Sequence, residues 1–185
     1  RVTTKLADGE FGIEFQNSDR FQVGVLQDYE LITRAFTVVP GARIAPGGYD
    51  FTVGRIGYNF GQQRVYSGNL LLERGGFYNG TRTGLSFTRS RVNFSSRLSV
   101  EPTATLNWIE LPAGQFSSRL IGSRITYTAT PTMFASALVQ YNSSTHSVST
   151  NARLRWEYRP GSELFVVYTE ERDSAAQAGI PGLFN

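Results

Sequence analysis

Few side chains in this sequence have the types and spacing that catalysis requires. His146 is the only histidine and lies in the segment NSSTHS, so no histidine cluster can form. Ser118 and Ser123 lie outside any GxSxG motif, the turn that exposes the nucleophile in a large class of hydrolases. Asp28 and Glu30 share one side of a predicted strand, as hydrolytic carboxylate pairs sometimes do, but polar lining of a sheet face explains them better. We therefore expect no catalytic residue and no enzyme.

Metal and cofactor sites are not indicated either. The chain has no cysteine, which excludes a disulfide framework and a thiolate metal site. The glycine pairs Gly47-Gly48 and Gly75-Gly76 lack the spacing of a phosphate-binding loop and are typical of loop tips. We predict no metal ion and no cofactor.

The composition narrows the class of protein. Charged residues make up 18% of the chain, against a usual share of about 25%, and aromatic residues reach 13%. The net charge is only +3 and the arginines are spread along the chain, which argues against a nucleic-acid partner. No window approaches the roughly 18 consecutive apolar residues of a membrane helix. Strands that expose every second residue to lipid remain compatible with this composition.

Alternation of polar and apolar residues is the dominant pattern. In FSSRLSVEPTATLNWIEL, residues 94–111, most even positions are apolar and most odd positions are polar. Side chains alternate between the two faces of a strand, so this segment has one apolar and one polar face. Helical spacing is nearly absent. We predict an all-β fold with strands at residues 3–16, 20–32, 49–60, 64–74, 81–89, 94–109, 116–129, 133–141, 148–159 and 162–171.

The alternation is interrupted at two places. Between Tyr49 and Phe60 the apolar residues change from odd to even positions, which predicts a β-bulge near Gly54. Pro102 has no backbone N–H to donate, so it predicts a second bulge or a break in the pairing of its strand.

The links between the predicted strands alternate in length. Links near Asn17, Gly61, Ser90, Pro131 and Pro160 are short, whereas longer ones cover residues 34–48, 75–80, 110–115, 142–147 and the tail after Arg172. Transmembrane barrels sort their links in this way, with tight periplasmic turns and longer outer loops. Most predicted strands also reach the roughly 9–11 residues of a tilted crossing. We predict one domain, residues 1–185, that forms all or part of an antiparallel up-and-down transmembrane β-barrel of about ten strands.

The barrel prediction assigns residues to its two surfaces. The polar faces of the strands carry the candidates for lining the lumen: Asp28, Glu30, Arg97, Glu101, Arg124, Arg155 and Glu157. The apolar faces carry the candidates for contact with lipid: Leu98, Leu106, Trp108, Leu154, Trp156 and Tyr158. Aromatic residues near strand ends predict an interfacial belt that contains Tyr49, Phe60, Trp108, Phe116, Trp156, Tyr158 and Tyr168. In the longer links, Phe36, Phe77 and Tyr78 either stack on a sugar ring or anchor the loops.

Three segments carry a family resemblance. They are NARLRWEYRPGSELFVVY (residues 151–168), YNSSTHS just before it and PGGYDF earlier in the chain. Together they resemble the C-terminal region of bacterial envelope proteins in which a family 9 carbohydrate-binding-like module precedes a barrel domain of unknown function. The resemblance implies an outer-membrane barrel and a saccharide-related role, and it assigns no catalytic residue. The chain ends at GIPGLFN, short of the aromatic-rich last strand usual in such barrels, which predicts a missing strand or part of a wider barrel.

The sequence thus predicts a function at the bacterial outer membrane. The first hypothesis is a passive pore or envelope anchor with a polar, charged lumen, linked to saccharide uptake through the resemblance. The alternative is a soluble β-sandwich or lipocalin-like module that binds carbohydrate, and a third hypothesis is a membrane enzyme of the lipid-modifying barrel type. The predicted partners are membrane lipid and a saccharide or small polar solute, with no nucleic acid. The sequence leaves the oligomeric state open.

Overall fold

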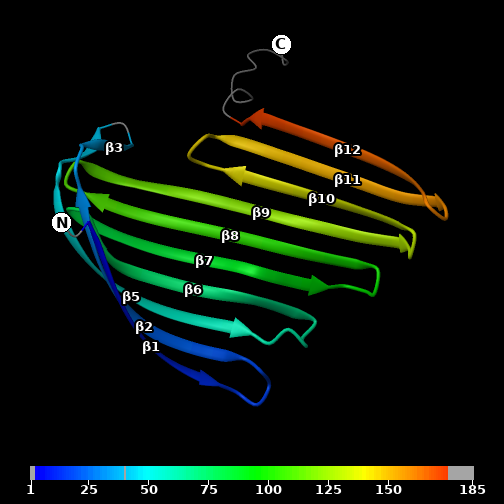
Figure 1. Cartoon of the computed structure of the whole chain (residues 1–185), viewed down its shortest axis with the longest axis horizontal. Helices are drawn as coiled ribbons and strands as arrows, with labels where there is room; N and C mark the ends of the chain where they lie inside the picture. Colours follow the sequence, from blue (N-terminus) through cyan, green and yellow to red (C-terminus); the bar gives the residue numbers. More distant parts are fainter. Residues whose placement is uncertain (1–2, 40, 175–185) are drawn as a thin grey trace, which may run out of the picture.

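The computed structural model of the chain describes residues 3–39 and 41–174. Ten strands form one antiparallel sheet, and two short strands form a separate hairpin (Figure 1). The sheet consists of β1 (Thr4–Glu14), β2 (Arg20–Ile32), β5 (Gly47–Phe60), β6 (Tyr66–Phe77), β7 (Gly80–Asn93), β8 (Leu98–Leu111), β9 (Gly114–Thr130), β10 (Met133–Asn142), β11 (Ser147–Arg159) and β12 (Ser162–Asp173). The hairpin consists of β3 (Phe36–Val39) and β4 (Ala42–Ile44).

The sheet has the simplest topology that ten strands can take. Each strand pairs with the preceding and following sheet strands of the sequence, and β1 and β12 form its two edges. The predicted all-β, antiparallel up-and-down arrangement is therefore confirmed. The sheet is open, however, because β1 and β12 lie at opposite edges of the curved layer (Figure 1). The segment 179–185, which suggested a missing last strand, lies outside the described residues.

The β3–β4 hairpin forms within the link between β2 and β5. It packs against the sheet through Ala42 and Ile44, which are buried together with Ile109 and Leu111 of β8. These four residues are the only buried hydrophobic side chains in the described part of the chain. We call the end of the sheet that carries this link the hairpin end, and the opposite end the far end.

Direct pairing assigns each paired strand residue to one of two faces, because opposed residues in an antiparallel pair point to the same side. Ile109 and Leu111, which contact the hairpin, define the hairpin face. The opposite face, which we call the apolar face, carries Leu106 and Trp108 of the same strand. The core of the molecule is therefore confined to one end of the hairpin face.

One of the two predicted irregularities is present. No register shift occurs near Gly54, where β5 pairs regularly with both neighbours, so the predicted bulge is wrong. The apolar residues change position there because Tyr49 lies on the hairpin face and packs against the buried cluster. Pro102 does lie opposite an interruption, since the pairing of β7 with β8 shifts between Phe87 and Val92.

The predicted sorting of links by length is wrong. Only Tyr78 and Asn79 separate β6 from β7, and only Pro112 and Ala113 separate β8 from β9. The strands continue through the glycine-containing segments that looked like loops. The link between β2 and β5 is the long one, and the hairpin within it packs onto the sheet.

The molecule exposes far more surface than a globular protein of its mass. Its accessible surface is 12991 Å², whereas a folded monomer of 20.5 kDa exposes about 8,900 Å². A sandwich of two sheets would bury one face of each strand along its whole length. The ten-stranded sheet forms a single layer instead, and the β3–β4 hairpin covers it at one end only. The described residues contain no helix long and apolar enough to cross a membrane.

Candidate functional site

The predicted lumen residues gather on the hairpin face, with one exception. Asp28, Glu30, Glu101, Arg124, Arg155 and Glu157 all point to this face. Arg97 does not, because it lies in the exposed link between β7 and β8, where its carbonyl accepts the N–H of Thr128. The predicted strand at residues 94–109 starts too early, since β8 begins at Leu98.

Five ion pairs cross between strands on the hairpin face. Each joins an arginine to a carboxylate, and two of them, Arg55–Asp8 and Arg155–Glu163, are in close contact. The others are Arg20–Glu10 at 2.8 Å, Arg82–Glu73 at 3.4 Å and Arg91–Glu101 at 2.7 Å. All these side chains are partly exposed, so each pair stabilises the fold only weakly. Their main effect is to neutralise charge along this face.

A glycine in β2 lets one of these pairs span three strands. Arg55 of β5 reaches Asp8 of β1 across Gly24 of β2. A Cβ atom at Gly24 would lie 2.8 Å from the carbonyl oxygen of Gly9 and 3.6 Å from Nη2 of Arg55. Any larger residue there would push against the backbone of β1. Sequence reasoning missed this pair, because its partners are far apart in the chain.

A hollow of about 200 Å³ lies on the hairpin face at the hairpin end. Asp28 and Glu30 of β2 line it together with Phe51, Phe77 and Tyr78. The hydroxyl of Tyr78 donates to Oε2 of Glu30 at 3.3 Å, whereas the buried Oδ1 of Asp28 has no hydrogen-bond partner. Burial, and next the negative charge of Glu30, raise the pKa of Tyr78 above its ordinary value. Arg82 also lines this hollow, so its lining combines two carboxylates with one guanidinium group.

The aromatic residues of the longer links anchor the hairpin. The ring of Tyr78 makes edge-to-face contacts with four other rings, at centroid distances of 5.5 Å to Phe36, 5.3 Å to Tyr49, 5.4 Å to Phe51 and 4.8 Å to Phe77. Rings packed on one another in this way hold the link between β2 and β5 against the sheet. Of the two predicted roles, the geometry favours loop anchoring over stacking on a sugar.

The predicted lipid-facing residues lie together on the opposite side of the sheet. Register places Leu98, Leu106, Trp108, Leu154 and Trp156 on the apolar face, and the Tyr158 ring contacts that of Trp156 at 6.0 Å. Trp108, Trp156 and Tyr158 have 42%, 44% and 54% of their surface exposed. The whole face is rich in exposed apolar side chains, which from β1 to β12 include Phe11, Val23, Ile56, Leu72, Ile121, Ile125, Val139, Leu164 and Val166.

Aromatic side chains form a row along the far end of the apolar face. Phe15, Tyr58, Phe60 and Tyr66 contact one another in sequence, with ring centroids 4.9 to 6.4 Å apart. Two residues predicted for the interfacial belt do not lie on the apolar face. Tyr49 and Phe116 are on the hairpin face and pack against the buried cluster.

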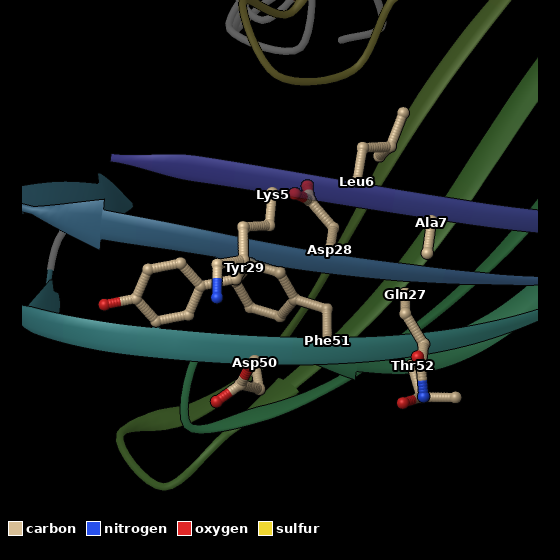
Figure 2. Close-up of a pocket in the computed structure, with 9 residues that line it drawn as sticks. All are labelled: Lys5, Leu6, Ala7, Gln27, Asp28, Tyr29, Asp50, Phe51 and Thr52. Carbon is tan, nitrogen blue, oxygen red and sulfur yellow. The ribbon is translucent and has the colours of Figure 1, made fainter. Parts of the chain in front are cut away.

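A second, shallow hollow of about 570 Å³ lies beside the free edge formed by β1. Figure 2 shows that Leu6, Asp28 and Phe51 point to one side of the three strands there, while Gln27 and Thr52 point to the other. At the hairpin end of these strands the apolar face carries polar side chains. Lys5, Tyr29 and Asp50 form a directly paired row there across β1, β2 and β5.

A buried carboxylate organises the far end. Asp19 is only 1% exposed and accepts hydrogen bonds from Gly61 N at 2.8 Å, the Tyr58 hydroxyl at 2.7 Å and Arg64 Nη2 at 2.6 Å. The Gly61 N–H, followed by the Tyr58 hydroxyl and the charge of Arg64, holds the pKa of Asp19 below its ordinary value against the opposing effect of burial. Asp19 therefore ties the link between β1 and β2 to the link between β5 and β6.

No catalytic or metal site is evident within residues 3–39 and 41–174. His146 lies in the link between β10 and β11, with its backbone carbonyl accepting from Ser174, and no group of three metal-binding side chains occurs there. Nothing in this part of the chain positively indicates an enzyme. Comparison with known proteins adds no assignment, because no family model, curated protein or solved structure matches the chain. The family resemblance in the sequence stays a prediction.

Proposed function

We propose that the chain forms the wall of a bacterial outer-membrane β-barrel, with its apolar face in contact with acyl chains and its hairpin face towards the lumen. The observation that carries this proposal is that most of the exposed large apolar side chains of the ten-stranded sheet gather on one face, while the other face holds five ion pairs. The exceptions on the hairpin face are Leu6, Leu120, Phe165 and Val167. Water does not favour such a surface, whereas lipid does. Inside a bilayer the sheet must close, because unpaired edge groups would have neither water nor a partner.

The height of the apolar face supports the same assignment. On β8 the apolar side of the strand runs from Leu98 to Trp108. At about 3.4 Å per residue and a tilt of about 40°, this stretch spans about 26 Å along the membrane normal. The apolar band of outer-membrane barrels is about 25 Å tall. The aromatic row at the far end then lies at one membrane interface.

The proposed lumen is narrow, and five ion pairs neutralise part of its charge. A barrel of about eight strands is just filled by its own side chains, so ten strands leave little free space. The ion pairs and the hairpin reduce this space further. We therefore infer either a passive pore for small polar solutes, saccharides among them, or an envelope anchor that conducts nothing.

Reconstitution of the full chain in planar bilayers tests the proposal. Discrete conductance steps identify a pore, and an Arg91→Glu variant should then shift the ion selectivity towards cations while Asp50→Asn, on the apolar face, should not. Insertion without conductance identifies an anchor. A protein that stays soluble and monodisperse without detergent would show that the membrane assignment is wrong.

A further inference from the structure

β12 has an edge that no strand in the described part of the chain pairs with. The strand is 12 residues long and contains neither proline nor lysine. Its segment 164–168, LFVVY, is exposed on both faces, from 44% at Leu164 to 62% at Phe165. Soluble proteins blunt such edges with lysine, proline or bulges, because unpaired N–H and C=O groups attract another strand. The charged residues of β12 lie at its two ends, at Glu163 and from Glu170 onward, so the apolar segment between them leaves the edge open to a partner strand.

The direction of the strands identifies this partner. β12 runs from the far end to the hairpin end, whereas β1 runs from the hairpin end to the far end. All copies of a membrane protein face the same way, so the β12 strands of two copies cannot pair antiparallel. We propose that β12 pairs with β1 of the same chain and closes the sheet into a ten-stranded barrel with one defined register. This inference rests on the membrane assignment proposed above.

A line of directly paired residues shows how far the strands are staggered. It starts at Ile13, near the far end of β1, and reaches Arg172, near the hairpin end of β12. Between them it passes through Phe21, Tyr58, Leu70, Phe87, Ala104, Ile121, Tyr141 and Val148. Closure must therefore join β12 to a part of β1 that lies well away from Ile13. A displacement of this kind is what tilts the strands of a barrel.

Charge selects one register for the seam. A shift by one residue would exchange the faces, so the acceptable registers differ by two. With Phe11 opposite Leu164, Lys5 lies opposite Glu170, and no like charges oppose one another. A shift by two residues that places Phe11 opposite Ser162 brings Glu10 opposite Glu163. The opposite shift, with Phe11 opposite Val166, brings Lys5 opposite Arg172 and Glu14 opposite Glu163. A shift by four places Asp8 opposite either Glu163 or Glu171. Like charges directly opposite each other destabilise a sheet.

Two further features agree with this register. Arg172 then lies opposite Thr3, so the line of pairs returns to β1 about ten residues from Ile13, which corresponds to a tilt of about 35°. Lys5 has no ion-pair partner among the described residues, and it borders the shallow hollow beside the free edge of β1 (Figure 2). The seam brings Glu170 to Lys5 and Tyr168 to Ala7, and so covers this side of the hollow.

Disulfide trapping in lipid vesicles tests the seam. The chain has no native cysteine, so pairs of introduced cysteines report single contacts. Phe11→Cys combined with Leu164→Cys should cross-link within one chain several times faster than Phe11→Cys with Ser162→Cys or with Val166→Cys. A second set guards against a misfolded variant: Ala7→Cys should cross-link with Tyr168→Cys and not with Val166→Cys or Glu170→Cys. Mobility on non-reducing gels and mass spectrometry separate internal from intermolecular bonds.

The outcomes distinguish this inference from the membrane assignment. If a control pair cross-links faster, the proposed register is wrong. If the variant with Phe11→Cys and Leu164→Cys forms disulfide-linked dimers, the sheet does not close within one chain. No cross-link in a vesicle-inserted protein overturns the seam and leaves the membrane assignment standing. A protein that does not insert into vesicles contradicts the membrane assignment itself.

Discussion

The two faces of the ten-stranded sheet differ in what covers them. The hairpin face carries its own cover, because β3 and β4 bury Ile44 against β8 at one end and ion pairs neutralise charge along the strands. The apolar face has no protein cover among the described residues, and side chains such as Ile56 and Val166 are about half exposed. In the membrane assignment proposed above, such a sheet separates two environments. It follows that the partner of the apolar face must come from outside the described part of the chain.

The largest expected effect comes from placing a charge on the apolar face. Ala104→Arg should lower the free energy of unfolding in lipid by about 2–4 kcal/mol, because Ala104 lies close to the middle of the apolar stretch from Leu98 to Trp108. Thr105→Arg, at the next residue of β8 but on the hairpin face, is the matched control and should change it much less. Urea unfolding in vesicles measures both variants. Equal losses of unfolding free energy in the two variants would contradict the assignment of different environments to the two faces.

A comparable but more local effect is expected at the cover of the hairpin face. Ile44→Ala deletes the most buried side chain of the hairpin, which is 1% exposed, and should weaken its packing by about 2–4 kcal/mol. Trypsin should then cut after the exposed Arg43 roughly 30-fold faster or more, because the hairpin opens locally. The free energy of global unfolding should stay unchanged. Thr37→Ala, at an exposed position of β3, is the control. An unchanged cleavage rate in Ile44→Ala would show that the hairpin is not held by this cluster.

A smaller, pH-dependent effect is expected at Asp19. Its pKa is lower in the folded protein than the value of about 3.9 usual for an unfolded chain. Its contribution to stability is therefore present above that value and is lost as the pH falls through the folded pKa. Asp19→Asn should reduce stability at neutral pH and flatten the loss at acid pH, whereas Asp50→Asn, at an exposed position, should do neither. Chemical unfolding between about pH 2 and pH 7 measures the free energy of unfolding of each variant. If this free energy changes with pH in the same way in wild type and Asp19→Asn, the ionised Asp19 does not contribute to stability as described.

The smallest effect is expected for an ion pair on the hairpin face. Arg91→Gln removes the partner of Glu101, and both side chains are partly exposed. The free energy of unfolding should fall by less than about 1 kcal/mol. The same urea titration checks this value, and a loss as large as that of Ala104→Arg would mean that water is excluded from the hairpin face.

The sequence was sufficient for the ten strands of the sheet and for the faces of most of their residues. The bounds of β2 follow from alternation alone, and the residues predicted for lumen and lipid contact fall on opposite faces, apart from Arg97. Tyr49 and Phe116 of the predicted belt are two further exceptions, since they pack against the buried cluster on the hairpin face. Alternation is a local signal, so it could not reveal contacts between distant segments. The hairpin was missed because β3 and β4 are only 4 and 3 residues long, and their apolar residues are explained by packing against β8. The Asp19 network was missed for the same reason, since its partners come from two separate links.

Site-specific fluorescence along β8 tests most directly whether the apolar face meets lipid. Single cysteines at residues 103 to 108, in a chain without native cysteine, carry an environment-sensitive dye and are exposed to lipids bearing a quencher. If acyl chains cover the apolar face, the dye is quenched at Ala104, Leu106 and Trp108 and not at Thr103, Thr105 and Asn107. Equal quenching at odd and even positions, or none at any, would contradict the account.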